Sequence, residues 1–343
     1  MNTVQTVKYT QKIYRHSKRI NSLTQTLPKN NLPILIGPWL GEVGPELLYW
    51  IPYLLKIREE GWFENHRLIA ISRGGVDAWY QNIVDEYVDV FDFLTTEEFR
   101  DINHERVNEL KVIKQISWQN SEKSLIQKIA HSKKYSDFLT LHPSIMWSEV
   151  FGHWNRDSSI QKPDFESLWN ILSPQKFIHP VEKHTRKVTE LNLPEKYIAA
   201  KFYFSDHSFP KTEKNIRFIQ ETLKHFSQKM PIVSMGIPHI IDDHESFIPQ
   251  DSFNIIDISN KLKLASNLGV QTEILRRSCG FIGSHGGFVI LAAFLDKADI
   301  SFYGSDKPLK NNHEPLISRL FQEFKQPYIV LETHQGKTLM EMF

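Results

Sequence analysis

The eighteen residues from Ile34 to Ile51, ILIGPWLGEVGPELLYWI, constrain the fold of this chain more than any other stretch. A short apolar run typical of a buried strand leads into a loop with three glycines, and an apolar-periodic segment begins at Pro45. Proline is favoured in the first turn of a helix, where its missing N–H costs nothing. The stretch therefore predicts a strand, a glycine loop and a helix, a geometry that brings a ligand against backbone N–H groups.

Two carboxylates, Glu42 and Glu46, lie in or beside this glycine loop. An acid at a helix start can serve simply as a partner of the helix dipole, and for Glu46 that interpretation stands beside a functional one. Glu42 follows Gly41 within the turn itself, where a dipole role accounts for it less well. We interpret Gly41 and Glu42 as the mouth of an active site.

Apolar, β-rich runs alternate with helical patterns along the chain, which is the signature of parallel α/β units. In the first half we predict strands at 31–36, 67–72 and 138–141, and helices at 45–60, from 76 onward and through much of 92–131. In the second half we predict strands at 197–204, 231–235, 253–258, 280–283, 300–303 and 328–331, and helices at 213–226, 268–277 and 287–295. Four prolines between residues 163 and 194 mark the boundary. The predicted parts are an arm, 1–30, and two Rossmann-like domains, 31–185 and 186–343.

A second glycine turn occurs in the segment FIGSHGGFVILAAFL, where a strand runs into Ser284, His285, Gly286 and Gly287 and then into an apolar helix. Such a turn lets a phosphate approach the backbone, and a side chain at either glycine would block that approach and the positive φ that we expect there. The spacing matches neither a dinucleotide fingerprint nor a P-loop. His285 is either a packed core histidine or a ligand contact, and its neighbours favour the ligand contact.

A third segment, KFYFSDHSFPKT, begins at Lys201, where a predicted strand ends. Open α/β sheets bind ligands at the carboxyl ends of their strands, so Lys201 and Tyr203 are candidate ligand contacts. A lysine within an apolar strand needs a partner, and both a phosphate and a neighbouring carboxylate fit. Asp206 and His207 add an acid and a base in the same loop, without a diagnostic spacing.

Metal and thiol chemistry receive little support. The acidic run Asp242–Glu245 has no second set of ligands at a convincing spacing, so we interpret it as a solvated loop and predict no metal site. No D-x-D, H-E-x-x-H or C-x-x-C occurs. The single cysteine, Cys279, stands in an apolar stretch, where we expect a buried and inert thiol. It excludes an intrachain disulfide and fits a cytoplasmic protein.

The net charge of +1 argues against a general nucleic-acid binder, but the charge is unevenly distributed. Residues 1–41 hold six lysines and arginines and no acid. Two interpretations of the arm, 1–30, stay open: a solvated basic tail, or a peripheral contact with the anionic lipid of the inner membrane. No run of eighteen apolar residues occurs, so no spanning helix is predicted.

Together the two glycine turns resemble the GT-B glycosyltransferases. The stretch from Asn267 to Tyr303 is similar to their donor-binding half, and the loop YFSDHSFPKT is similar to one in bacterial cell-surface polysaccharide transferases. The pair Gly41 and Glu42 resembles the Gly-Glu pair of the Kdo transferases of lipopolysaccharide synthesis, in which the glutamate is the general base. Trp39 stands where that family has serine, so a Kdo donor is not implied.

The resemblance implies two Rossmann-like domains facing each other across a cleft, and transfer of a sugar from a nucleotide donor to a surface glycan such as lipopolysaccharide or capsule. It implies Glu42 as the general base. From the residues themselves we keep Asp206 and His207 in reserve, and we predict no cofactor. Donor contacts would come from Gly41, Lys201, Tyr203, Ser284, His285, Gly286 and Gly287. The alternatives are a nucleotide-sugar epimerase and a non-catalytic partner in glycan assembly.

Overall fold

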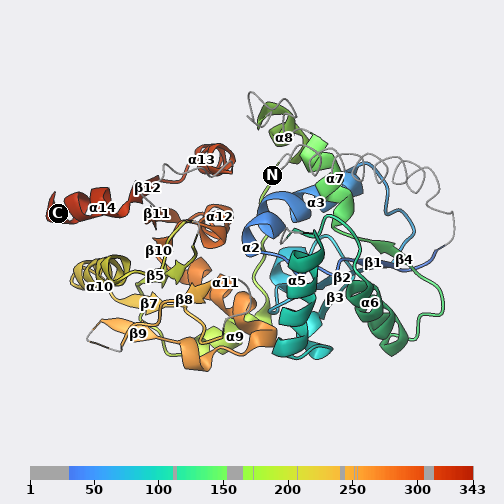
Figure 1. Ribbon diagram of the computed structural model, residues 1–343, viewed down its shortest axis with the longest axis horizontal. Helices are drawn as coiled ribbons and strands as arrows, with labels where there is room; N and C mark the ends of the chain where they lie inside the picture. The colour runs from blue at the N-terminus through green and yellow to red at the C-terminus, as the bar shows by residue number, and fades with distance from the viewer. Residues whose placement is uncertain are drawn as a thin grey trace. The chain divides into compact units, whose positions relative to one another are not determined.

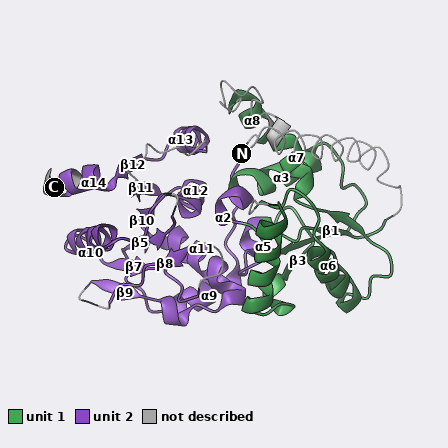
Figure 2. Ribbon diagram, in the orientation of Figure 1, with its two compact units in different colours: residues 1–41, 48–72, 80–174 green, residues 42–47, 73–79, 175–343 purple. Residues whose placement is uncertain are grey.

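The computed structural model describes residues 31–110, 114–152, 165–172, 174–206, 208–239, 244–250, 252, 254–304 and 313–342 (Figure 1). The basic arm, 1–30, lies outside the described residues, so its contact with anionic lipid stays a prediction. The chain divides into two compact units (Figure 2). Unit 1 comprises the described residues of 1–41, 48–72 and 80–174, and unit 2 those of 42–47, 73–79 and 175–343.

Unit 1 contains a four-stranded parallel sheet with the strand order β3-β2-β1-β4. Its strands are β1 (Ile34–Ile36), β2 (Leu68–Ser72), β3 (Glu86–Asp89) and β4 (Leu139–Leu141). Its helices include α3 (Ile51–Glu59), η2 (Val90–Asp92), α5 (Thr96–Leu110), α6 (Asn120–Ser132), α7 (Ser144–Gly152) and α8 (Phe165–Leu172). Because the chain enters the sheet at β1 and reverses its direction of winding at β4, the switch point of unit 1 lies between these two strands.

Unit 2 contains a six-stranded parallel sheet with the order β12-β11-β10-β5-β7-β9. Its strands are β5 (Ile198–Lys201), β7 (Ile232–Ser234), β9 (Ile255–Asp257), β10 (Gly280–Ser284), β11 (Ala298–Tyr303) and β12 (Tyr328–Glu332). Its helical elements include α9 (Glu182–Glu190), α10 (Glu213–Ser227), η3 (Ser259–Lys261), η4 (Leu264–Ser266), α11 (Asn267–Arg277), α12 (Gly287–Phe294), α13 (Glu314–Glu323) and α14 (Thr333–Met342). The chain enters at β5, adds β7 and β9 on one side and then β10, β11 and β12 on the other. Three strands therefore lie on each side of the switch point between β5 and β10, which is the doubly wound order.

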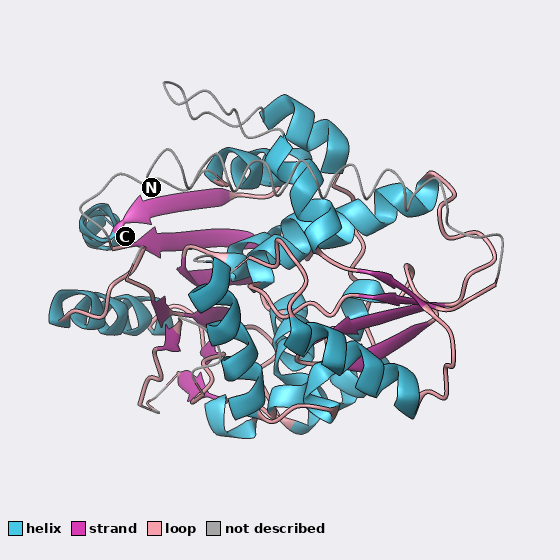
Figure 3. Cartoon of the chain, turned by 45° about the vertical axis from the view of Figure 1, so that its right-hand side comes forward, coloured by secondary structure: helices cyan, strands magenta, loops and turns pink. Residues whose placement is uncertain are grey.

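Helices lie on both sides of the six-stranded sheet (Figure 3), and its two faces pack against different helices. Alternate strand residues such as Ala200, Ile282 and Phe302 form an apolar core with α10. The residues between them point to the other side, where Phe281 stacks on Phe288 of α12. Since successive side chains of a strand alternate between faces, Lys201 lies on the face that packs against α12. The prediction of an α/β fold with a parallel sheet in each half of the chain is confirmed.

Two short segments from the first half of the chain belong to unit 2. The first contains α2 (Val43–Pro45), and the second contains most of α4 (Asp77–Tyr80). The second segment packs closely on α11, because a Cβ placed on Gly269 would lie 2.2 Å from the carbonyl oxygen of Gly75. Trp79 Nε1 also donates to Thr272 Oγ1 at 3.0 Å. Turns that follow β1 and β2 therefore help to build unit 2.

Local structure departs from the sequence-based expectation in the predicted helix at 45–60. The helical run starts at Val43, so Pro45 is its third residue rather than its first. A π-helical segment, η1 (Glu46–Trp50), separates α2 from α3. Pro52 follows directly, and a proline cannot donate the N–H that an α-helix needs there. The widened turn before Pro52 is the consequence.

Two further elements differ from expectation. The helix predicted from Val76 is only the four residues of α4. Strand β3 (Glu86–Asp89) follows it and was not predicted. Acidic residues interrupt the apolar pattern of β3, which forms the edge of its sheet. The strand predicted at 197–204 is divided, because Tyr203 and Phe204 leave the sheet as β6 and pair antiparallel with β8 (Glu245–Ser246).

Candidate active site

The carboxyl ends of β5 and β10 meet at the switch point of unit 2, and the predicted ligand residues gather there. Lys201 at the end of β5 is in register with Gly283 of β10. Ser284 Oγ lies 3.0 Å from the Tyr203 backbone nitrogen and 2.9 Å from its carbonyl oxygen. The Tyr203 hydroxyl donates to the His285 carbonyl oxygen at 2.9 Å. The structure thus joins two segments that are about eighty residues apart in sequence.

The two glycines of the turn are required by close packing, and the expected positive φ is wrong. Gly286 has φ 166°, which is extended backbone, and Gly287 begins α12. A Cβ on Gly286 would lie 1.7 Å from the Tyr203 hydroxyl oxygen, and one on Gly287 would lie 2.7 Å from the Gly44 backbone nitrogen. Valine at Gly287 would therefore disturb the packing of α2, so it does not test ligand binding by itself.

His285 is buried, with 4% of its surface exposed. Its Nδ1 lies 3.4 Å from Ser301 Oγ, and its Nε2 has no hydrogen-bond partner among the described residues. Burial lowers the pKa of His285 to about 4. The imidazole is therefore neutral at pH 7, so it can donate or accept a hydrogen bond but carries no charge to a ligand.

Lys201 is also buried, and three of its contacts are with uncharged groups. Its Nζ lies 3.3 Å from the amide oxygen of Gln271 and 3.4 Å from the carbonyl oxygen of Met235. The ammonium also stands over the ring of Phe288, 4.2 Å from its centroid. Two of these groups are neutral oxygens and the third is an aromatic face, which attracts a cation. They hold a positive charge beside the second residue of α12.

The glycine loop of the first half contributes directly to this site. A Cβ placed on Gly44 would lie 3.4 Å from the Gly287 Cα, so α2 and α12 meet glycine to glycine. Glu42 immediately precedes α2, is half-buried, and makes no side-chain hydrogen bond to cap that helix. The prediction that Glu42 lies in a turn at a helix start agrees with the structure. Its catalytic role stays a prediction.

Glu46 pairs with Arg73, for which the sequence analysis predicted no role. Glu46 is fully buried, and its Oε2 accepts from Arg73 Nη1 at 2.9 Å. Arg73 follows β2 at the carboxyl end of the unit 1 sheet and is itself buried. The sequence left a helix-dipole role and a functional role open for Glu46, and the structure adds a buried ion pair that neither interpretation included. A lone arginine before two glycines was the only sequence signal for its partner.

Four other predictions have different outcomes. Asp206 is described and exposed, whereas His207 lies outside the described residues. The acidic pair 242–243 also lies outside them, and the residues that the structure describes contain no group of three metal-ligating side chains.

Cys279 is exposed, so the expected burial is wrong. It precedes β10 at the amino end of the sheet, where an apolar run in the sequence does not ensure that a side chain is buried. No described helix has the length and apolar character needed to cross a bilayer.

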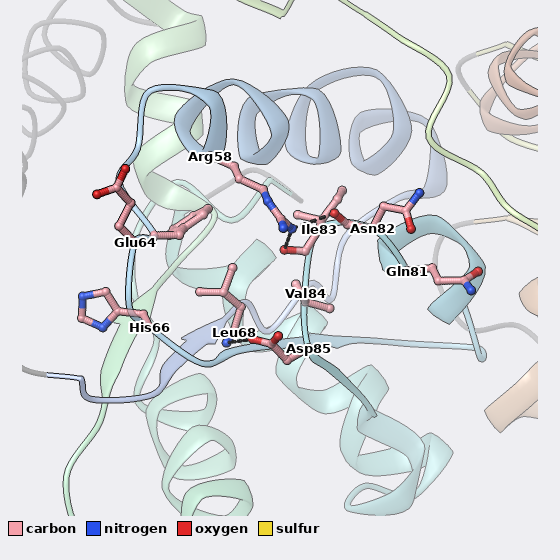
Figure 4. A pocket seen from close by; sticks show the side chains of 10 residues that line it. Arg58, Glu64, His66, Leu68, Gln81, Asn82, Ile83, Val84 and Asp85 are labelled. Atoms are coloured by element: carbon pink, nitrogen blue, oxygen red, sulfur yellow. Dashed lines mark hydrogen bonds between the residues drawn. The ribbon is translucent and has the colours of Figure 1, made fainter.

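A separate hollow of about 490 Å³ lies in unit 1 (Figure 4). Arg58 lines it and donates through Nη1 to the carbonyl oxygens of Asn82, at 2.6 Å, and Ile83. Asp85 accepts from the backbone nitrogen of Leu68, the first residue of β2. The hollow thus lies at the amino ends of the strands, whereas open α/β sheets bind ligands at the carboxyl ends. We assign it no part in the candidate site.

Comparison with known proteins yields only distant likenesses. No protein-family model and no curated protein sequence matches the chain. A glycosyl transferase family 9 structure from Veillonella parvula DSM 2008 is 12% identical, with 91% of this chain and 89% of that one covered and a TM-score of 0.48. The E. coli ADP-heptose lps heptosyltransferase II is 12% identical, with 88% and 90% covered and a TM-score of 0.46.

A UDP-GlcNAc 2-epimerase from Methanocaldococcus jannaschii is 11% identical, with 90% of each chain covered and a TM-score of 0.41. Because these TM-scores are below 0.5, the likenesses identify neither a family nor an activity for this chain.

Proposed function

We propose that the protein is a glycosyltransferase that moves a sugar from a nucleotide-sugar donor to a glycan acceptor such as lipopolysaccharide or capsule. One observation carries the proposal: the turn at the start of α12 lies at the switch point of unit 2 and packs against Gly44, two residues after Glu42. A phosphate-binding geometry and a carboxylate are thereby brought to one place.

The proposed reaction needs one base and one set of phosphate contacts. The Glu42 carboxylate takes the proton of the acceptor hydroxyl, whose oxygen forms a bond to the anomeric carbon of the donor. The bond from that carbon to the phosphate oxygen breaks, and the nucleotide leaves with the electron pair. Backbone N–H groups of Gly286 and Gly287 stabilise the leaving phosphate. His285 adds a neutral hydrogen bond, and Lys201 adds positive charge.

Nucleotide binding is the first test. We expect one member of a panel of UDP, GDP, CMP, ADP and dTDP to raise the melting temperature of the full chain, since a ligand at a hundred times its Kd stabilises by about 2.7 kcal/mol. Tyr203→Phe removes the hydroxyl that holds the His285 carbonyl and is expected to weaken binding about five- to tenfold. Tyr87→Phe makes the same change in unit 1, where the hydroxyl bonds Asp89, and should leave affinity unaltered.

The panel and a donor-only incubation separate the alternatives. A protein that binds no nucleotide would be the non-catalytic partner. Epimerisation of a nucleotide sugar in the absence of acceptor would identify the epimerase. Equal loss of affinity in Tyr203→Phe and Tyr87→Phe would remove the turn at 284–287 from the nucleotide site.

Chelation is the second test. We expect transfer to be unaffected, within twofold, after dialysis against EDTA, because a helix start, backbone N–H groups and Lys201 supply the phosphate contacts of the proposed reaction. The measurement is the initial rate before dialysis, after it, and after adding Mg²⁺ or Mn²⁺. A rate that falls on chelation and returns with either ion would show that a metal participates, and the acidic run Asp242–Glu245 would then be the first place to look.

A further inference from the structure

The loop between β1 and α2 is held by one buried side chain from a distant part of unit 1. Gln115 Nε2 donates to the Pro38 carbonyl oxygen at 2.8 Å, and Gln115 Oε1 accepts from the Leu40 backbone nitrogen at 2.8 Å. The side chain is 1% exposed. Its amide therefore spans three residues of the loop and satisfies two backbone groups that would otherwise be buried without a partner.

The orientation of this amide is determined by a third contact. Gln115 Nε2 also donates to Glu122 Oε1 at 2.9 Å. Reversing the amide would place its oxygen against the Glu122 carboxylate and its NH₂ group against the Leu40 N–H. Both contacts would be repulsive, so only one orientation is compatible with the surrounding groups. The loop thus receives a donor and an acceptor at fixed positions.

Glu122 is in turn held as a buried carboxylate. Its Oε1 accepts from Arg106 Nη2 at 2.8 Å, and its Oε2 lies 3.1 Å from His142 Nε2 and accepts from the Gln119 backbone nitrogen at 3.0 Å. Arg106, Glu122 and His142 are all fully buried. Hydrogen bonds to a charged acceptor are stronger than neutral ones, so the network presents a rigid support to Gln115.

We propose that Gln115, supported by Glu122, is a positioning residue that fixes residues 38–41 and through them Glu42. The inference rests on the proposed function, because it gives Gln115 a role only if Glu42 acts in the reaction. Glu42 is two residues beyond Leu40 along the chain, so the loop sets where its backbone begins. A misplacement of about 1 Å at a reacting group can lower a rate about a hundredfold.

The test compares Gln115→Leu with a control in the same network. Leucine keeps much of the volume and removes all three hydrogen bonds. Asn103→Ala removes the oxygen that accepts from Arg106 Nη1 at 2.8 Å, which disturbs the network without touching the loop. Hydrogen–deuterium exchange of the full chain is read at Leu40, together with kcat, nucleotide Kd and melting temperature.

We expect exchange at Leu40 to become at least about tenfold faster in Gln115→Leu and to be unaltered in Asn103→Ala. The expected kcat falls about 10- to 100-fold in Gln115→Leu, with nucleotide Kd unchanged, and stays near the wild-type value in Asn103→Ala even if both proteins melt earlier. Unaltered exchange in Gln115→Leu, or an equal loss of kcat in the two variants, would overturn the positioning role. A wild-type protein without transferase activity would overturn the proposed function, and the exchange result would still show whether Gln115 holds the loop.

Discussion

Glu42→Gln is expected to lower kcat by about 10²–10⁴ while leaving nucleotide affinity and melting temperature close to those of the wild type. Glutamine keeps the shape of the side chain but cannot take the proton of the acceptor hydroxyl. Glu42 is half-buried, and glutamine has nearly the same size and polarity, so we expect the substitution to change the packing little. The nucleotide contacts proposed here come from other residues. The measurements are kcat, nucleotide Kd and melting temperature.

Glu46→Gln is the matched control, because the same change four residues later should give the opposite pattern. Glu46 is buried in its ion pair with Arg73. Removing one partner of such a pair costs about 3–5 kcal/mol, since the other charge is left buried. We therefore expect a clearly lower melting temperature and, in the protein that stays folded, a kcat closer to normal than that of Glu42→Gln. A near-normal kcat in Glu42→Gln would remove it as the base, and Asp206 or His207 would take its place.

The second large effect is expected in acid, at Glu122. Burial alone raises the pKa of a carboxyl group, but the charge and hydrogen bond of His142, with Arg106 and the Gln119 N–H, lower the pKa of Glu122 to about 2. The ordinary value is 4.5. Because the folded pKa is the lower one, this group stabilises the fold fully above about pH 4.5. The contribution, about 3 kcal/mol, is lost as the pH falls toward 2.

Glu122→Gln should therefore lower the free energy of unfolding by about 3–5 kcal/mol at pH 7. The variant should also show a flatter dependence on pH between 5 and 2, since it lacks the group that titrates there. Urea unfolding at pH 7, 5, 4 and 3 measures both effects, and Glu109→Gln, an exposed carboxylate on α5, serves as the control. Parallel curves for wild type and Glu122→Gln would show that the buried carboxylate does not control acid stability.

Much of the fold was predictable because its signals are local. A strand that is buried on both faces has a continuous apolar run in its sequence. Helix α12 likewise consists of eight residues without a charge. The glycine turns after β1 and β10 could be located in the same way, since close backbone approach requires glycine at those positions. Parallel strands that are joined by helices allow few possible connections. The alternation of strands and helices was therefore enough to predict two α/β units. Strand β3 was missed because its acidic residues hide the period of the strand.

The partners of the polar side chains were decided only by the tertiary structure. Glu46 and Arg73, Lys201 and Gln271, and Gln115 with the loop after β1 are separated by 27, 70 and more than 70 residues. Sequence can mark such a residue as needing a partner, because burying a polar group without one is costly. It cannot name the partner, since that depends on which strands lie side by side. Strand order is a property of the whole chain, and here it brings the ends of β5 and β10 together.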